Sequence, residues 1–188
     1  MLRKAIILMS LAVIFVPSTA NSEEGERLKI GTQAPKFTLK DADDKEHSLD
    51  PILNKDKASA KVIILVMGDR SVREPNDKWA IELDKIYGKK KEVTVLMIAD
   101  LRGLPFFATE GMVKWGVKRE KIPATILLDW GGKVNKLYKA QRGKPNLFVI
   151  GYDSKILYHY VGPYSAESIK EIQTKVQENL SEKKKKGA

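Results

Sequence analysis

The residues best suited to chemistry in this sequence lie in one short polar turn, from Gly68 to Arg73, that follows a buried apolar run. Arg70 and Arg73 place two guanidinium groups beside the hydroxyl of Ser71, at the predicted start of a helix. Backbone N–H groups at a helix N-terminus bind anions, and a serine there can cap them. The turn is therefore a candidate site for a carboxylate or for an extended peptide backbone. A capped helix with two surface arginines is the alternative interpretation.

Neither catalysis by Ser71 nor a metal site is expected. A serine nucleophile needs a general base within hydrogen-bond reach, and the two histidines, His47 and His159, belong to segments that do not face the turn. Two distant histidines without a local carboxylate motif do not make a zinc site. The aspartates of segment 41–45 lack the glycine and glutamate of a calcium loop. We expect no catalytic residue, no metal and no cofactor.

The sequence contains no cysteine. This absence excludes intrinsic dithiol exchange, thiol peroxidase chemistry, cysteine nucleophiles and thiolate metal sites, because each of these needs a sulfur atom of the chain. It is informative because exported proteins are free to carry disulfides.

An N-terminal leader over residues 1–20 predicts export. Arg3 and Lys4 precede an apolar segment, 5–16, and small residues at 18–20 form a cleavage site. The apolar segment is too short for a transmembrane helix. We therefore expect a periplasmic protein with no stable membrane insertion after the leader is removed.

The formal net charge is +10 at pH 7, and four of the positive charges lie in Lys183 to Lys186. A terminal lysine run predicts a disordered, solubilising tail, here 181–188. No nucleic-acid motif accompanies the charge, so nucleic acid is not an expected partner, and steering of acidic ligands is the favoured use. The expected partner is an unidentified periplasmic protein or peptide, preferably acidic.

Alternating apolar and polar segments predict a single α/β domain over 30–180, after a flexible entry at 21–29. A hairpin with an acidic turn is predicted at 37–49, and an aromatic-rich helix is predicted at 106–115, with Phe107, Val113 and Trp115 in the core. Trp79 and Trp130 are likewise assigned to the core or its rim. The remaining predicted elements are strands at 62–67, 93–99, 124–129, 146–151 and 156–161, and helices over 75–87 and 134–139 and after a cap at Ser165.

This order of elements resembles the thioredoxin fold in its peroxiredoxin and redoxin (AhpC/TSA-like) branch. The likeness covers Ile30 to Asn179 and includes IGTQAPKFTLKDADDKEHSL near the start and KPNLFVIGYDSKILYHYVGPYSAESIKEI near the end. It implies a central mixed sheet flanked by helices, with an N-terminal β-hairpin extension and a cis-proline at Pro145. The family's cysteine would fall within Ser71 to Pro75, which reads Ser-Val-Arg-Glu-Pro. Within this branch the chain resembles the YtfJ type of small periplasmic proteins at Gly68, Ser71, Arg73, Glu74 and Asn76.

The resemblance implies a binding groove without a reactive group. In redox-active relatives the groove holds a substrate chain beside the cysteine, and backbone groups near the proline pair with that chain as in strand addition. Asp69 is expected to pair with Arg70 or Lys144. A redoxin-like oxidoreductase that depends on a partner's thiol or a bound cofactor is the alternative, and a purely structural role in an envelope complex is the third. The expected groove consists of Gly68, Asp69, Arg70, Ser71, Arg73, Lys144 and Pro145.

Overall fold

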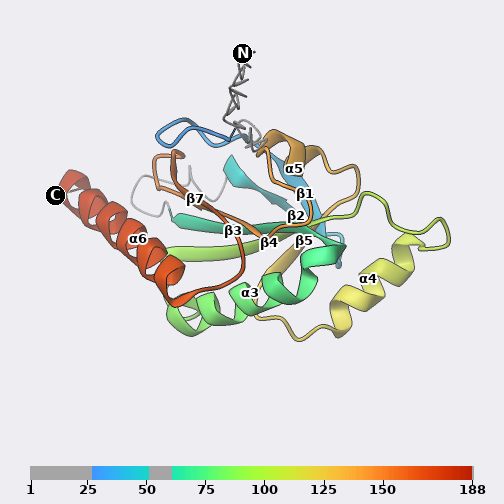
Figure 1. Ribbon diagram of the computed structural model, residues 1–188. Helices are drawn as coiled ribbons and strands as arrows, with labels where there is room; N and C mark the ends of the chain where they lie inside the picture. The colour runs from blue at the N-terminus through green and yellow to red at the C-terminus, as the bar shows by residue number, and fades with distance from the viewer. Residues whose placement is uncertain (1–26, 51–60, 188) are drawn as a thin grey trace, which may run out of the picture.

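A computed structural model describes residues 27–50 and 61–187, which form a seven-stranded mixed sheet with helices on both faces (Figure 1). The predicted leader, most of the predicted flexible entry and the segment 51–60 lie outside the described residues. Within the described ranges, no helix is long and apolar enough to cross a membrane.

The strands lie side by side in the order β2-β1-β5-β4-β3-β6-β7. β3, β4 and β5 are parallel, β6 and β7 continue the sheet antiparallel on one side, and the β1–β2 hairpin continues it antiparallel on the other. The carboxyl ends of the three parallel strands therefore meet at one edge of the sheet. The elements are β1 (Thr38–Asp41), β2 (Glu46–Ser48), β3 (Val62–Asp69), the 3-10 turn η1 (Arg70–Val72), α3 (Arg73–Tyr87), β4 (Val93–Asp100), α4 (Glu110–Arg119), β5 (Thr125–Asp129), α5 (Lys133–Leu137), β6 (Asn146–Ile150), β7 (Ile156–Val161) and α6 (Ala166–Gly187).

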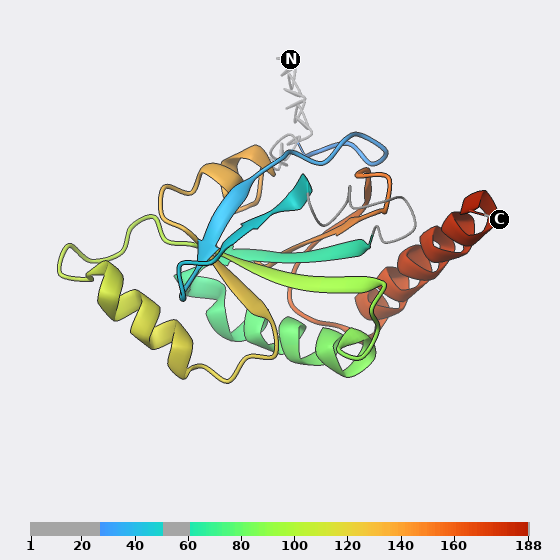
Figure 2. The same ribbon diagram turned by 180° about the vertical axis from the view of Figure 1, so that it is seen from behind.

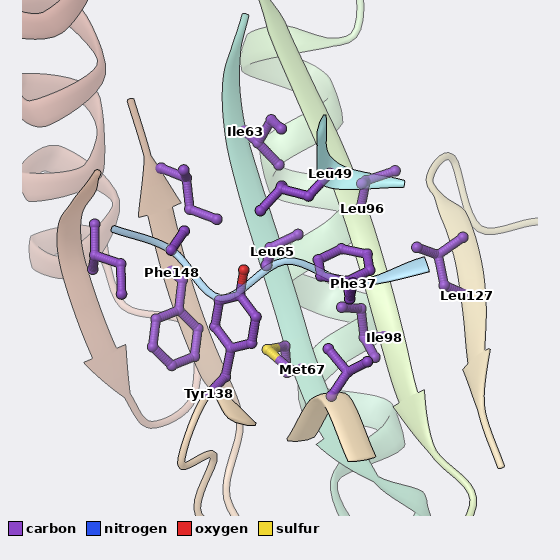
Figure 3. Close-up of a cluster of buried hydrophobic side chains, with 14 residues drawn as sticks. Phe37, Leu49, Ile63, Leu65, Met67, Leu96, Ile98, Leu127, Tyr138 and Phe148 are labelled. Atoms are coloured by element: carbon purple, nitrogen blue, oxygen red, sulfur yellow. The ribbon is translucent and has the colours of Figure 1, made fainter. Parts of the chain in front are cut away.

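The apolar run of β3 supplies the centre of both core layers, as its sequence predicts. Successive side chains of a strand point to opposite faces, and every residue from Val62 to Met67 is fully buried. On one face β3 packs against Trp79 of α3 and Ile172 of α6. On the other face it packs against the aromatic side chains of Tyr138 and Phe148 (Figure 3).

The predicted N-terminal hairpin is confirmed as β1 and β2. The carboxylate of Asp41 closes its acidic turn, because it accepts the backbone N–H groups of Asp43 at 2.9 Å and Lys45 at 3.1 Å. Its second oxygen lies 2.7 Å from Nε2 of His47. The turn is thus held by its own side chains.

The aromatic helix differs from the prediction in its start and in its packing. The side chain of Thr109 accepts the backbone N–H of Met112 at 3.3 Å, so α4 begins at Glu110 and the predicted core residue Phe107 lies in the preceding turn. Phe107 is 62% exposed and Trp115 is 61% exposed. No residue of α4 is buried, and the helix lies at one end of the molecule (Figure 2). Assigning these aromatic residues to the core was therefore wrong.

The last helix is longer than predicted. Ser165 caps it as expected, since its hydroxyl accepts the backbone N–H of Ser168 at 3.1 Å. α6 then continues through the lysine run to Gly187 and projects from the body (Figure 1), so residues 181–187 differ from the predicted disordered tail. Lysines in a last helical turn interact favourably with the helix dipole, and Nζ of Lys186 lies 6.0 Å from the ring centroid of Tyr152.

His159 on β7 makes the stability of the fold sensitive to acid. Its ring stacks on Phe148 with a centroid distance of 4.0 Å, and neither ring nitrogen has a hydrogen-bond partner in the part of the chain that is described. Burial, and then the positive charge of Arg27, lowers the pKa of His159 from 6.5 to about 4. The unfolded chain therefore binds a proton at higher pH than the folded chain.

We expect the free energy of unfolding to decrease as the pH falls from about 6.5 to about 4, by up to about 2 kcal/mol after allowance for solvent screening. Urea unfolding across this range measures the decrease. His159→Phe preserves a stacked ring and is the control, because it removes the titrating group. An acid sensitivity as large in His159→Phe as in the unmodified protein would contradict the assignment.

Candidate functional site

Asp69, the last residue of β3, occupies the turn in which the sequence predicts a binding groove. Its carboxylate accepts hydrogen bonds from the backbone N–H of Ser71 at 2.9 Å and from the Ser71 hydroxyl. It also accepts the backbone N–H of Gly143 at 3.0 Å, and Nε of Arg142 lies 3.5 Å away. Asp69 therefore caps η1 and links it to the loop that precedes β6.

These contacts keep the carboxylate of Asp69 ionised and hydrogen-bonded. Burial acts to raise its pKa, but the hydrogen bonds from Ser71 and Gly143, together with the charge of Arg142, outweigh burial and leave the pKa below 3.8. A carboxylate with these partners serves as an anchor of the turn.

The turn differs in two respects from the sequence-based expectation. Val72, and not Ser71, occupies the N-cap position of α3. The partners of Asp69 are Ser71, Gly143 and Arg142, so its expected pairing with Arg70 or Lys144 is not observed. The sequence could not identify Gly143 and Arg142, because they lie more than seventy residues further along the chain.

The loop before β6 closes on itself. The Lys144–Pro145 peptide bond is trans, like every other peptide bond in the described ranges, so the implied cis-proline is absent. The side-chain amide of Asn146 accepts the backbone N–H of Gln141 at 2.9 Å and donates to the carbonyl of Lys144 at 2.7 Å. Gly143 adopts a left-handed conformation with φ of 71°. Asp69 and Gly143 thus join the turn of Ser71 to the loop that contains Lys144 and Pro145.

Two more aspartates continue the row at this edge of the sheet. Asp69, Asp100 and Asp129 are register partners on β3, β4 and β5. Asp100 accepts the backbone N–H of Arg102 at 3.0 Å and its Nε at 2.9 Å. Asp129 accepts the backbone N–H of Asn135 at 2.9 Å and its Nδ2 at 3.0 Å. Asp100 and Asp129 accept hydrogen bonds within their own turns, whereas Asp69 also binds Gly143 of the loop before β6.

The aspartate row was not predicted, although a signal for it exists. Three strands that end in aspartate, read as VMGD, MIAD and ILLD, place three carboxylates at the same edge of a parallel sheet. Their partners Arg102 and Asn135 follow within a few residues, as in other turns that an aspartate organises.

Gly68 allows β3 and α3 to approach each other. A Cβ atom at this position would lie 2.5 Å from Cγ2 of Val72 and 2.6 Å from Nδ2 of Asn76. We expect Gly68→Ala to lower the free energy of unfolding by about 2 kcal/mol, because both of these buried side chains must move. Urea unfolding measures the change. Gly111→Ala in α4 is the control, since a Cβ atom there meets nothing within 4 Å; equal losses in both variants would contradict the steric explanation.

A hollow of about 400 Å³ lies between the start of α3 and α4, on the side of the turn away from Gly143. Because α4 has no buried residue, the space between this helix and the end of β4 is not filled by a packed layer. Most of the lining side chains are apolar and come from β4, the loop after it and α4. They include Met97, Ala99, Leu104, Met112, Val113 and Val117.

Charged groups form one rim of this hollow. Nη2 of Arg73 lies 2.6 Å from Oε1 of Glu120, and its Nε lies 3.7 Å from Oδ2 of Asp77. Burial raises the pKa of both carboxyl groups, and the charge of Arg73 opposes that effect. The ion pair joins the start of α3 to the end of α4. Arg70 also lines the hollow, so the two predicted site arginines lie on the α4 side, whereas Ser71 binds Asp69.

The sequence and the fold are similar to those of known redox proteins. The model of the AhpC/TSA family matches residues 30–159. The thiol-disulfide oxidoreductase ResA of Bacillus cereus is 28% identical over 171 residues, which cover 91% of this chain and 92% of that protein. A second ResA, from Bacillus thuringiensis, is 28% identical over 178 residues, or 94% of this chain and 96% of that protein.

Solved structures establish the fold as thioredoxin-like. A protein described as thiol:disulfide interchange protein DsbE, from Chlorobium tepidum, matches with a TM-score of 0.61 and 18% identity, over 81% of this chain and 99% of that chain. An exposed lipoprotein thioredoxin from Streptococcus pneumoniae matches with a TM-score of 0.53 and 19% identity, over 75% of this chain and 98% of that chain. The predicted thioredoxin-like α/β fold is thereby confirmed.

Proposed function

We propose that this protein is a non-catalytic binding module for an extended segment of a partner protein or peptide. The chain belongs to the AhpC/TSA family and contains no cysteine. The family supplies the scaffold. The absence of sulfur removes intrinsic thiol exchange, which needs a thiolate nucleophile on the chain. The proposed binding site is the hollow between α3 and α4.

The observation that carries the proposal is the contrast between the two sides of the turn after β3. On one side Asp69 joins Ser71 to Gly143 of the loop before β6. On the other side lies the hollow of about 400 Å³, a size typical of binding sites, which run from about 300 to 1,000 Å³. An extended segment across its mouth can place one apolar side chain inside.

Exposed apolar side chains next to the hollow support the same assignment. Met112 lines the hollow and is 58% exposed. Phe107 is adjacent in sequence to Ala108, which lines the hollow, and is 62% exposed. Apolar groups gathered at the surface of a folded domain mark interaction sites, because their burial by a partner is favourable.

Export to the periplasm is part of the proposal. The sequence of residues 1–20 has the charge, apolar length and small residues of a signal peptide. One structural neighbour is described as an exposed lipoprotein. Cell fractionation and N-terminal sequencing test this part: the mature protein is expected in the periplasm and to begin after Ala20. An uncleaved protein that is found in the cytoplasm would contradict export.

Photo-crosslinking in living cells tests the binding site. A photoreactive amino acid is placed at position 112 beside the hollow, at position 144 in the loop before β6, or at position 136 on the exposed surface of α5. The proposal predicts a defined protein adduct from position 112 and none from position 136. Adducts from position 144 without any from position 112 would show that the hollow is not the site.

A redox role through a partner's thiol is the second candidate function, because relatives are named thiol-disulfide oxidoreductases. In that case the chain would hold a partner while the partner's cysteine reacts. The two candidates differ in one result: whether adding this protein changes the thiol-disulfide turnover of the captured partner.

A further inference from the structure

The helix α4 is attached to the rest of the molecule largely through charged side chains. No residue of α4 is buried, whereas α3 buries Trp79 and Leu83, so apolar packing holds α4 less firmly. Among residues 27–50 and 61–187, three ion pairs join α4 or its C-cap to other elements, each with a nitrogen-to-oxygen distance of 2.6 Å. They are Glu120 with Arg73 of α3, Lys114 with Asp44, and Lys118 with Asp43. The helix is thus tied to α3 and to the turn of the β1–β2 hairpin.

Two of the cations in these pairs have a second carboxylate partner on their own helix. Nε of Arg73 lies 3.7 Å from Oδ2 of Asp77 in α3, and Nζ of Lys114 lies 2.6 Å from Oε1 of Glu110 in α4. If α4 moves away from the body, Arg73 and Lys114 therefore each keep an ion pair. Exposed ion pairs are individually weak and are screened by salt. The contacts that hold α4 can consequently break without leaving either cation unpaired.

Two hollows adjoin α4, and both are lined by Val117 and Glu120. Their volumes are about 400 Å³ and about 230 Å³, and the smaller one reaches the hairpin turn at Asp43. The helix itself has only ten residues and contains Gly111 and Gly116. Short helices that contain glycine are marginally stable on their own. We therefore expect α4 to open as a local unit, at a lower free energy than the rest of the fold.

We propose that α4 is a flap over the hollow. It is closed by its ion pairs with α3 and with the hairpin turn, and it opens when Arg73 and Lys114 keep only the partners on their own helices. This inference rests on the proposed function, because the hollow is the same site, and it adds the step that controls access. An open flap widens the mouth of the hollow for the side chain of a bound segment. High salt favours the open flap, because it screens the exposed pairs that close it.

Hydrogen exchange of the full chain, followed by mass spectrometry, tests the flap. Amides of α4 are expected to exchange about tenfold faster at about 1 M than at about 0.02 M sodium chloride, because three exposed ion pairs weaken together. Amides of α3 in the same sample are the internal reference and are expected to keep their rates. At low salt, Glu120→Gln is expected to accelerate exchange in α4 by about threefold. Glu82→Gln is its matched control, because it removes an ion pair with Lys85 within α3 and none of those that hold α4.

The inference would be overturned by α4 rates that do not depend on salt, by equal acceleration in α3 and α4, or by equal α4 rates in Glu120→Gln and Glu82→Gln. The flap and the binding site fail separately. Salt-dependent opening without any adduct from position 112 would support the flap and reject the partner segment. An adduct from position 112 in a chain whose α4 rates do not depend on salt would support the binding site and reject the flap.

Discussion

Replacing Asp69 by alanine is expected to lower the free energy of unfolding by about 3 kcal/mol, composed of about 1 kcal/mol for each of its three hydrogen bonds. The carboxylate accepts two hydrogen bonds from Ser71 and one from Gly143. Its loss would also free the loop before β6 from η1. Urea unfolding gives the energy, and amide hydrogen exchange at Ser71 and Gly143 reports the separation of the turn from this loop.

Two variants control for this result. Asp69→Asn keeps an oxygen acceptor in the capping position and is expected to cost about 1 kcal/mol. Asp43→Ala removes an exposed carboxylate that pairs with Lys118 and is expected to change stability by less than about 0.5 kcal/mol. A loss in Asp69→Ala no larger than that in Asp43→Ala would refute the bridge.

The bridge also has a defined pH dependence. Because folding lowers the pKa of Asp69, its carboxylate stabilises the fold fully at pH values well above the pKa of the unfolded chain, and this effect is lost as the pH falls through the pKa of the folded chain. The difference in stability between the unmodified protein and Asp69→Ala is therefore expected to shrink below about pH 4.

Filling the hollow from inside is expected to abolish partner binding without loss of stability. Gly116 of α4 lines the hollow, and a Cβ atom there meets nothing within 4 Å. Gly116→Leu would place an isobutyl group in the space proposed for the partner's side chain. Leucine also favours a helix over glycine by about 0.8 kcal/mol, so the melting temperature is expected to be unchanged or higher. The adduct from position 112 is expected to fall at least about tenfold, as loss of a buried anchor implies.

Gly111→Leu is the matched control for this change. Gly111 belongs to the same helix, also has nothing within 4 Å of its Cβ position, and is exposed. Its replacement has the same effect on helix propensity but does not fill the hollow. The adduct from position 112 is expected to persist in Gly111→Leu. Equal loss of the adduct in both glycine variants would show that the change in α4 itself, and not the filling of the hollow, prevents binding.

The architecture was predictable because its signals are local. The uninterrupted apolar run of β3, the break after it and the helical spacing of Trp79 and Leu83 each span only a few residues. Phe107 and Trp115 were assigned to the core because burial of an aromatic side chain is favourable, but apolar character alone does not show which side chains are buried. The start of α4 depends on the capping side chain of Thr109. Composition likewise could not show that the lysine run would continue α6.

The site was less predictable because its contacts join distant segments. Asp69 at the end of β3 binds Gly143 in the loop before the neighbouring strand β6, and Arg73 pairs with Glu120 at the rim of the hollow. No spacing along the chain encodes either pair. The turn itself was located correctly from the strand-to-helix transition. The hollow on the α4 side of the turn was not predicted.

Thiol-disulfide turnover in the presence of the captured partner tests most directly whether this protein binds without exchanging electrons. The partner identified from position 112 is assayed with insulin disulfide and with hydrogen peroxide, alone and mixed with an equal amount of this protein. The account predicts that this protein alone gives no rate above buffer and that the mixture reacts at the rate of the partner alone. A mixture that turns over faster than the partner, and loses that gain with Gly116→Leu, would contradict the account and establish the redox role.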